Sequence, residues 1–142
     1  MKIKIGLITV GTHCQKNIIP SLAAMNNVEL VGFYTRNLDT ASVITKKYNI
    51  TYYDELDKML AEAAIDFVYI SSPNALHYPH IIKALSNKIN VIVEKTAVAN
   101  LQQAKKVVEL AAEHNLLVYE AFMYRHHQQF SRLKKVIDNE TY

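Results

Sequence analysis

Six short runs of Ile, Val and other apolar residues recur along the 142-residue chain, and segments with apolar residues at helical spacing separate them. The runs cover residues 3–10, 28–35, 51–53, 66–71, 90–94 and 116–121, and the third run is the weakest. Largely uninterrupted apolar runs are typical of strands covered on both faces, as in a parallel sheet. The alternation therefore predicts a doubly wound α/β domain, with a mostly parallel six-stranded sheet in the order 3-2-1-4-5-6.

Composition and charge exclude several classes of protein. Half of the residues are apolar, which is enough for a sizeable core, and the formal net charge is only +3, with scattered basic residues. We therefore expect no nucleic-acid partner. No apolar run approaches the roughly 20 residues of a membrane-spanning helix, and the N-terminus lacks a signal-peptide pattern. Because Cys14 is the single cysteine, no internal disulfide can form, and we expect a cytoplasmic protein without a membrane partner.

The first strand is followed by a turn with one glycine, in the sequence GLITVGTHCQKNI. The dinucleotide-binding fingerprint G-x-G-x-x-G/A would place its small residues at Thr9, Gly11 and Cys14, so only the middle glycine is kept. That glycine allows the backbone to approach a pyrophosphate, and the next helix N-terminus supplies amide donors. A plain strand-to-helix turn is the alternative. We interpret Cys14 as a packed thiol rather than a nucleophile.

The second strand ends in Thr35 and Arg36, at the place where dinucleotide-binding folds distinguish their cofactors. An acidic residue there would bind the ribose 2′-hydroxyl of NAD, whereas an arginine accepts the 2′-phosphate of NADP. The alternative is an ordinary solvated arginine in a loop.

The fourth strand ends in the sequence SSPN at residues 71–74. Its small polar groups can line a ribose or nicotinamide pocket, cap the next helix through Ser72 or Asn74, or do both. His77 and His80 follow, three residues apart, without a cysteine or carboxylate to complete a metal site. We interpret them as a surface pair and expect no metal.

The fifth strand, VIV, runs directly into Glu94 and Lys95. A charged pair after a buried strand is either an ion pair in solvent or the rim of a cleft. In a cleft, desolvation and neighbouring charges tune a catalytic group.

Taken in order, the five strand ends resemble the Gfo/Idh/MocA oxidoreductases, the family of glucose-fructose oxidoreductase and inositol dehydrogenase. They are Gly11, Thr35-Arg36, SSPNALH, VIVEKTA and LLVYEAFMYRHHQQF, and together they span nearly the whole chain. The resemblance implies an NAD(P)-binding Rossmann domain over residues 1–121. Residues 122–142 would form a C-terminal helix and the start of a second, substrate-binding domain, the rest of which is absent from this chain.

The resemblance also implies a role for each matching residue. Lys95 would be catalytic, beside the nicotinamide and the reacting hydroxyl or carbonyl group of the substrate. Thr35, Arg36 and Asn37 stand in for the family's SRD-like sequence, which favours NADP over NAD. Glu120 and Arg125 match a family pattern, EA-x-x-x-R, and would reach the nicotinamide end. The implied cofactor-binding residues are Thr9, Gly11, Thr12, His13, Thr35, Arg36, Ser71, Ser72, Pro73, Asn74, His77 and Glu94.

Three positions depart from the family pattern: Thr9 replaces the first glycine, Thr96 the proline of Glu-Lys-Pro, and Gln128 a common proline. We expect an NADP-dependent oxidoreductase that acts on CH–OH groups of a sugar-like or other alcohol or carbonyl small-molecule substrate. The alternative is a non-catalytic nucleotide-binding or interaction module with the same fold. In relatives, the second domain would cover the apolar residues of VYEAFMYRHHQQF. Without that domain these residues are less covered, and exposed apolar patches favour association, so we also expect a homo-oligomer.

Overall fold

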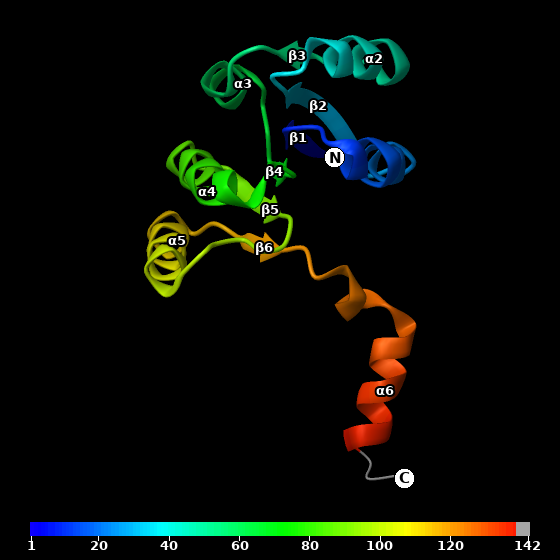
Figure 1. Cartoon of the computed structure of the whole chain (residues 1–142), viewed down its shortest axis with the longest axis vertical. Coiled ribbons are helices and arrows are strands. Elements are labelled where there is room, and N and C mark those ends of the chain that lie inside the picture. Colours follow the sequence, from blue (N-terminus) through cyan, green and yellow to red (C-terminus); the bar gives the residue numbers. More distant parts are fainter. Residues whose placement is uncertain (139–142) are drawn as a thin grey trace.

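The computed structural model describes residues 1–138 and contains a parallel sheet (Figure 1). Its six strands lie in the order β3-β2-β1-β4-β5-β6, and each neighbouring pair is parallel. The strands are β1 (Ile3–Ile8), β2 (Val28–Tyr34), β3 (Tyr52–Tyr53), β4 (Phe67–Ile70), β5 (Asn90–Val93) and β6 (Val118–Glu120). The predicted doubly wound arrangement and strand order are confirmed.

Helices cover both faces of the sheet (Figure 1). One face packs against α3 (Leu56–Glu62), α4 (His77–Ser86) and α5 (Leu101–His114). The other packs against the π-helical turn η1 (Cys14–Ile18), α1 (Ile19–Ala23) and α2 (Leu38–Tyr48). Successive strand residues point to opposite faces, so Val68 and Ile70 enter the first core and Tyr69 the second. Burial on both faces explains why the strands are continuous apolar runs.

Asparagines stand at both ends of α2 and α5, which lie on opposite faces of the sheet. Asn37 and Asn100 accept hydrogen bonds from the amides three residues ahead, at the starts of α2 and α5. Asn49 and Asn115 end the same helices in the left-handed conformation, with φ of 54° and 53°. The asparagines therefore set where α2 and α5 begin and where the chain turns toward the next strand.

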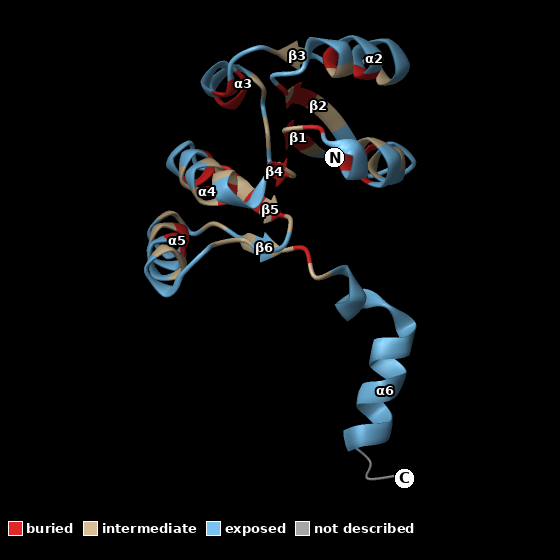
Figure 2. Ribbon diagram, in the orientation of Figure 1, coloured by how far each residue is buried: buried red, intermediate tan, exposed pale blue. Residues whose placement is uncertain are grey.

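The C-terminal segment stands apart from the sheet (Figure 1). It consists of a 3₁₀ turn, η3 (Met123–His126), and the helix α6 (Gln128–Asp138). Figure 2 shows that α6 is exposed along its whole length, including its apolar side chains. A helix was predicted here, and residues 139–142 of that segment lie outside the described residues. No helix within residues 1–138 has the length and apolar character needed to cross a bilayer.

Candidate cofactor site

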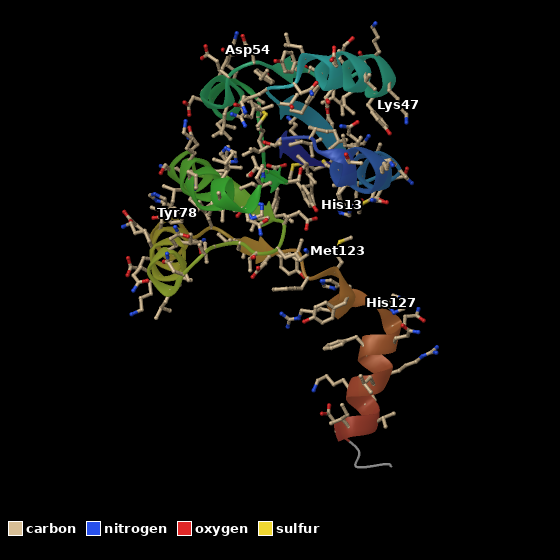
Figure 3. All side chains as sticks on the ribbon, in the orientation of Figure 1. His13, Lys47, Asp54, Tyr78, Met123 and His127 are labelled. Carbon is tan, nitrogen blue, oxygen red and sulfur yellow. The ribbon has the colours of Figure 1, made fainter. Side chains whose placement is uncertain are left out.

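A pocket of about 270 Å³ lies where the carboxyl ends of the central strands meet. Its walls are Gly11, His13, Cys14, Ser71, Ser72, Glu94 and Lys95. Figure 3 shows His13 at this edge of the sheet, beside the start of the helix that follows β1. Open α/β sheets bind their ligands at this edge, near the point where the strand order reverses. Six of the predicted site residues thus come together from three separate strand ends.

Gly11 forms the open floor of the pocket at the start of the first helix. A Cβ atom added at Gly11 would meet no protein atom within 4 Å, so the packing of the chain does not itself require glycine there. The exposed Thr12 and His13 follow, and the Gly11 carbonyl accepts the amide of Gln15 in the first helical turn. Backbone amides of such a turn are ready donors to an anionic group. The residues present therefore fit the pyrophosphate of a dinucleotide.

Thr9 departs from the fingerprint glycine and still adopts a glycine-like backbone. Its φ of 64° lies in the left-handed region, which β-branched residues rarely enter. Its amide donates to the Tyr34 carbonyl at 2.8 Å, and its carbonyl accepts the Ser71 hydroxyl at 2.6 Å. The tight turn of the fingerprint is therefore kept by hydrogen bonds to β2 and to the end of β4.

Glu94 forms the acidic wall of the pocket. Its Oε1 accepts the Tyr69 hydroxyl at 2.6 Å and lies 3.4 Å from Nε2 of His13. The Glu94 side chain is 19% exposed and that of His13 is 53% exposed. Burial, together with the hydrogen bond to Glu94 and its charge, raises the pKa of Tyr69. Tyr69 is therefore a hydrogen-bond donor at neutral pH, and the Glu94 carboxylate is directed to Tyr69 and His13 while Lys95 is exposed.

Cys14 lies beneath the pocket and is fully buried. Burial raises the pKa of the Cys14 thiol from 9.0 to about 11; a hydrogen bond with Ser71 lowers it, and the charge of Glu94 raises it further. The thiol is therefore protonated at neutral pH. This agrees with the packed thiol that the sequence indicated.

Thr35 and Arg36 lie at the end of β2, outside the pocket. Thr35 is buried, its hydroxyl accepts the amide of Asn37 at 3.3 Å, and its carbonyl accepts the hydroxyl of Tyr52. Arg36 is exposed beside it. Buried Thr35 thus anchors the backbone next to the exposed Arg36.

The alternative in which Ser72 or Asn74 caps the next helix is wrong. The Ser72 hydroxyl lies 3.0 Å from Nδ1 of His80, and the Asn74 side-chain amide donates to the Thr96 hydroxyl at 3.5 Å. A 3₁₀ turn, η2 (Asn74–Leu76), separates Pro73 from α4, so neither side chain stands at the α4 N-cap. Pro73 and Asn74 are exposed at the rim.

The prediction of a surface pair is wrong for His77, which is 0% exposed. Its helix begins against the sheet, and its spacing of three from His80 places both rings toward the strand ends rather than toward solvent. Nε2 of His77 lies 2.7 Å from the Ser72 carbonyl oxygen, and Nδ1 lies 2.7 Å from the Thr96 carbonyl oxygen. Sequence analysis gave no indication of this double contact.

Glu120 reaches the same region from β6. Its Oε1 accepts the amide of Ala97 at 2.9 Å, two residues beyond Lys95. Arg125 lies in η3 and is exposed. Among residues 1–138, no group of three or more His, Cys, Asp or Glu side chains is arranged to hold a metal ion.

A family model described as "Oxidoreductase family, NAD-binding Rossmann fold", named GFO_IDH_MocA, matches residues 3–122. The chain belongs to this family. An uncharacterized oxidoreductase of Escherichia coli, YgjR, is 31% identical over 115 residues, which are 80% of this chain and 35% of YgjR. The scyllo-inositol 2-dehydrogenase (NADP(+)) IolU of Bacillus subtilis is 27% identical over 89% of this chain and 39% of its own length.

Solved structures agree with this assignment. The crystal structure of KijD10, a 3-ketoreductase from Actinomadura kijaniata in complex with NADP, is 26% identical and has a TM-score of 0.92. The match covers 99% of this chain and 45% of KijD10. The chain spans less than half of the length of each of these three relatives. The Gfo/Idh/MocA prediction and the NAD-binding Rossmann fold are confirmed.

Proposed function

We propose that this chain binds NADP(H) in preference to NAD(H) and forms the cofactor half of an oxidoreductase. The substrate class is a sugar-like or other small alcohol or carbonyl compound. The observation that carries the proposal is the pocket that joins Gly11 and His13 to Glu94 and Lys95. It brings an anion-binding helix start and an exposed lysine to the same strand ends, inside a fold whose family binds NAD.

Each part of the chain has a distinct task in this proposal. Gly11, Thr12 and His13 bind the pyrophosphate, and Arg36 binds the 2′-phosphate beside buried Thr35. When bound, the nicotinamide supplies the site for hydride transfer. Lys95, exposed at the strand end, donates a hydrogen bond or proton to the reacting oxygen of the substrate. The name of IolU includes NADP(+), and the KijD10 structure contains bound NADP. Both support the choice of cofactor.

The preference for NADP is tested by titrating the chain with NADPH and NADH and following nicotinamide fluorescence. A charge-assisted contact to phosphate contributes about 1.5–3 kcal/mol. Arg36→Ala should therefore weaken NADPH binding at least tenfold and leave NADH binding nearly unchanged. Arg132→Ala, on the exposed helix α6, is the matched control and should change neither. Equal affinities of the unmodified chain for the two cofactors would refute the preference.

We expect the 142-residue chain to bind cofactor with little turnover. Lys95 is exposed, and holding a substrate carbon against the nicotinamide accounts for about 7–11 kcal/mol of a barrier. The assay is NADP reduction with a panel of polyols, sugars and diols, with Lys95→Met as the comparison. Robust turnover that disappears in Lys95→Met would contradict this expectation. Absence of both binding and turnover would favour a non-catalytic module.

We also propose that the chain self-associates through the apolar face of α6. Phe130, Leu133, Val136 and Ile137 recur at helical spacing on this face, and all four are exposed. Figure 2 shows the helix extending away from the sheet. Contiguous exposed apolar surface of this kind favours association.

A further inference from the structure

His77 is a buried histidine between two backbone carbonyl oxygens. It begins α4 and has no exposed surface. Its two ring nitrogens lie 2.7 Å from the carbonyl oxygens of Ser72 and Thr96, respectively. Ser72 follows β4 and Thr96 follows β5, so the ring bridges the ends of two neighbouring strands.

The two contacts place the ring between the end of β4 and the turn after β5. A ring N–H group donates to a carbonyl oxygen, which can only accept a hydrogen bond. The other ring nitrogen lies against the second carbonyl oxygen, so the buried ring sets the spacing of the two strand ends.

We propose that buried His77 positions the turn carrying Lys95. Its two close contacts tie the turn at residues 95–97 to the end of β4. On the other side of the turn, Glu120 accepts the amide of Ala97 at 2.9 Å. The backbone around Lys95 is thus held from α4 and from β6, while the Lys95 side chain stays exposed. His77 acts through this backbone and does not touch the substrate.

The test reads the position of the turn. Amide hydrogen exchange at Ala97, whose amide donates to Glu120, should accelerate at least tenfold in His77→Gln. Both N–H groups of a glutamine amide lie on one nitrogen, so they cannot replace contacts that the ring makes from two nitrogens. Exchange in β1 should stay unchanged. His114→Gln, in the last turn of α5, is the matched control and should leave the turn as it is. Unchanged exchange at the turn in a folded His77→Gln variant would refute the positioning role.

The inference rests on the proposed function only for the role of Lys95. The exchange measurement is made without cofactor, so a chain that fails to bind NADPH can still show that His77 holds the turn. If NADPH binds, His77→Gln should weaken it, whereas His114→Gln should not. Binding that is equal in the two variants would separate the turn from the cofactor and overturn the positioning of Lys95.

Discussion

Thr9 combines a β-branched side chain with the left-handed backbone of the turn after β1. Replacing Thr9 therefore tests what stabilises this turn. Its φ is 64°. For residues other than glycine, this conformation costs about 1–2 kcal/mol because Cβ approaches the following carbonyl. The cost is opposed by the two hydrogen bonds that the Thr9 backbone makes with Tyr34 and Ser71. Neither bond involves the Thr9 side chain, so both persist in any Thr9 variant.

The informative comparison is Thr9→Gly with Thr9→Ala. Both remove the hydroxyl and the methyl group, but only glycine removes Cβ and with it the left-handed penalty. Glycine also makes the unfolded chain more flexible, which offsets about 0.5–1 kcal/mol of that gain. The glycine variant should therefore unfold with a free energy about 1 kcal/mol higher than the alanine variant, corresponding to roughly 3 °C in melting temperature.

Urea unfolding followed by circular dichroism measures this difference, and calorimetry gives the melting temperatures. An alanine variant as stable as the glycine variant would refute the reasoning, because it would show that the turn carries no left-handed penalty. The same pair should also be titrated with NADPH. If the fingerprint turn is already in place, Thr9→Gly should bind NADPH as tightly as the unmodified chain, whereas a large gain would show that Thr9 obstructs the pyrophosphate.

Two further predictions concern the core and the exposed helix. The pKa of Cys14 is raised to about 11 in the fold, so its contribution to stability is complete below about pH 9 and is lost as the pH rises toward 11, by about 2–3 kcal/mol. The native thiol should accordingly react with iodoacetamide far more slowly at pH 8 than the thiol of the urea-unfolded chain, and equal rates would contradict this. On α6, Leu133→Lys should abolish association measured by light scattering, whereas Gln129→Lys, which adds the same charge, should preserve it. A monomeric unmodified chain at high concentration would exclude this interface.

The strand order could be predicted because the central strands β1, β4 and β5 are largely buried on both faces. Continuous apolar runs then coincide with strands, and α2 and α5 end in asparagines that the sequence shows directly. The polar strand ends could also be predicted to meet, since parallel strands place their carboxyl ends at one edge. Gly11, Ser71, Ser72 and Lys95 come together for this reason.

Contacts between distant residues could not be predicted in the same way. Tyr69 looks like an ordinary aromatic strand residue in the sequence FVYI, and its partner Glu94 lies 25 positions away. Only the pairing of β4 with β5 brings the hydroxyl to the carboxylate. The spacing of His77 and His80 likewise shows that they share a helix face, but not that this face meets the sheet. The ring of His77 is buried because α4 packs there.

The charged pair that ends β5 follows from where the strand stops. Val91 and Val93 are fully buried, so a charge within the strand would lose its hydration without a partner. Glu94 is the first side chain at the rim, where the Tyr69 hydroxyl and His13 replace part of its water. Lys95 follows in solvent, on a turn that His77 and Glu120 hold by its backbone. The carboxylate is therefore held through its side chain and the lysine through its main chain, which leaves the ammonium group in solvent at a defined place.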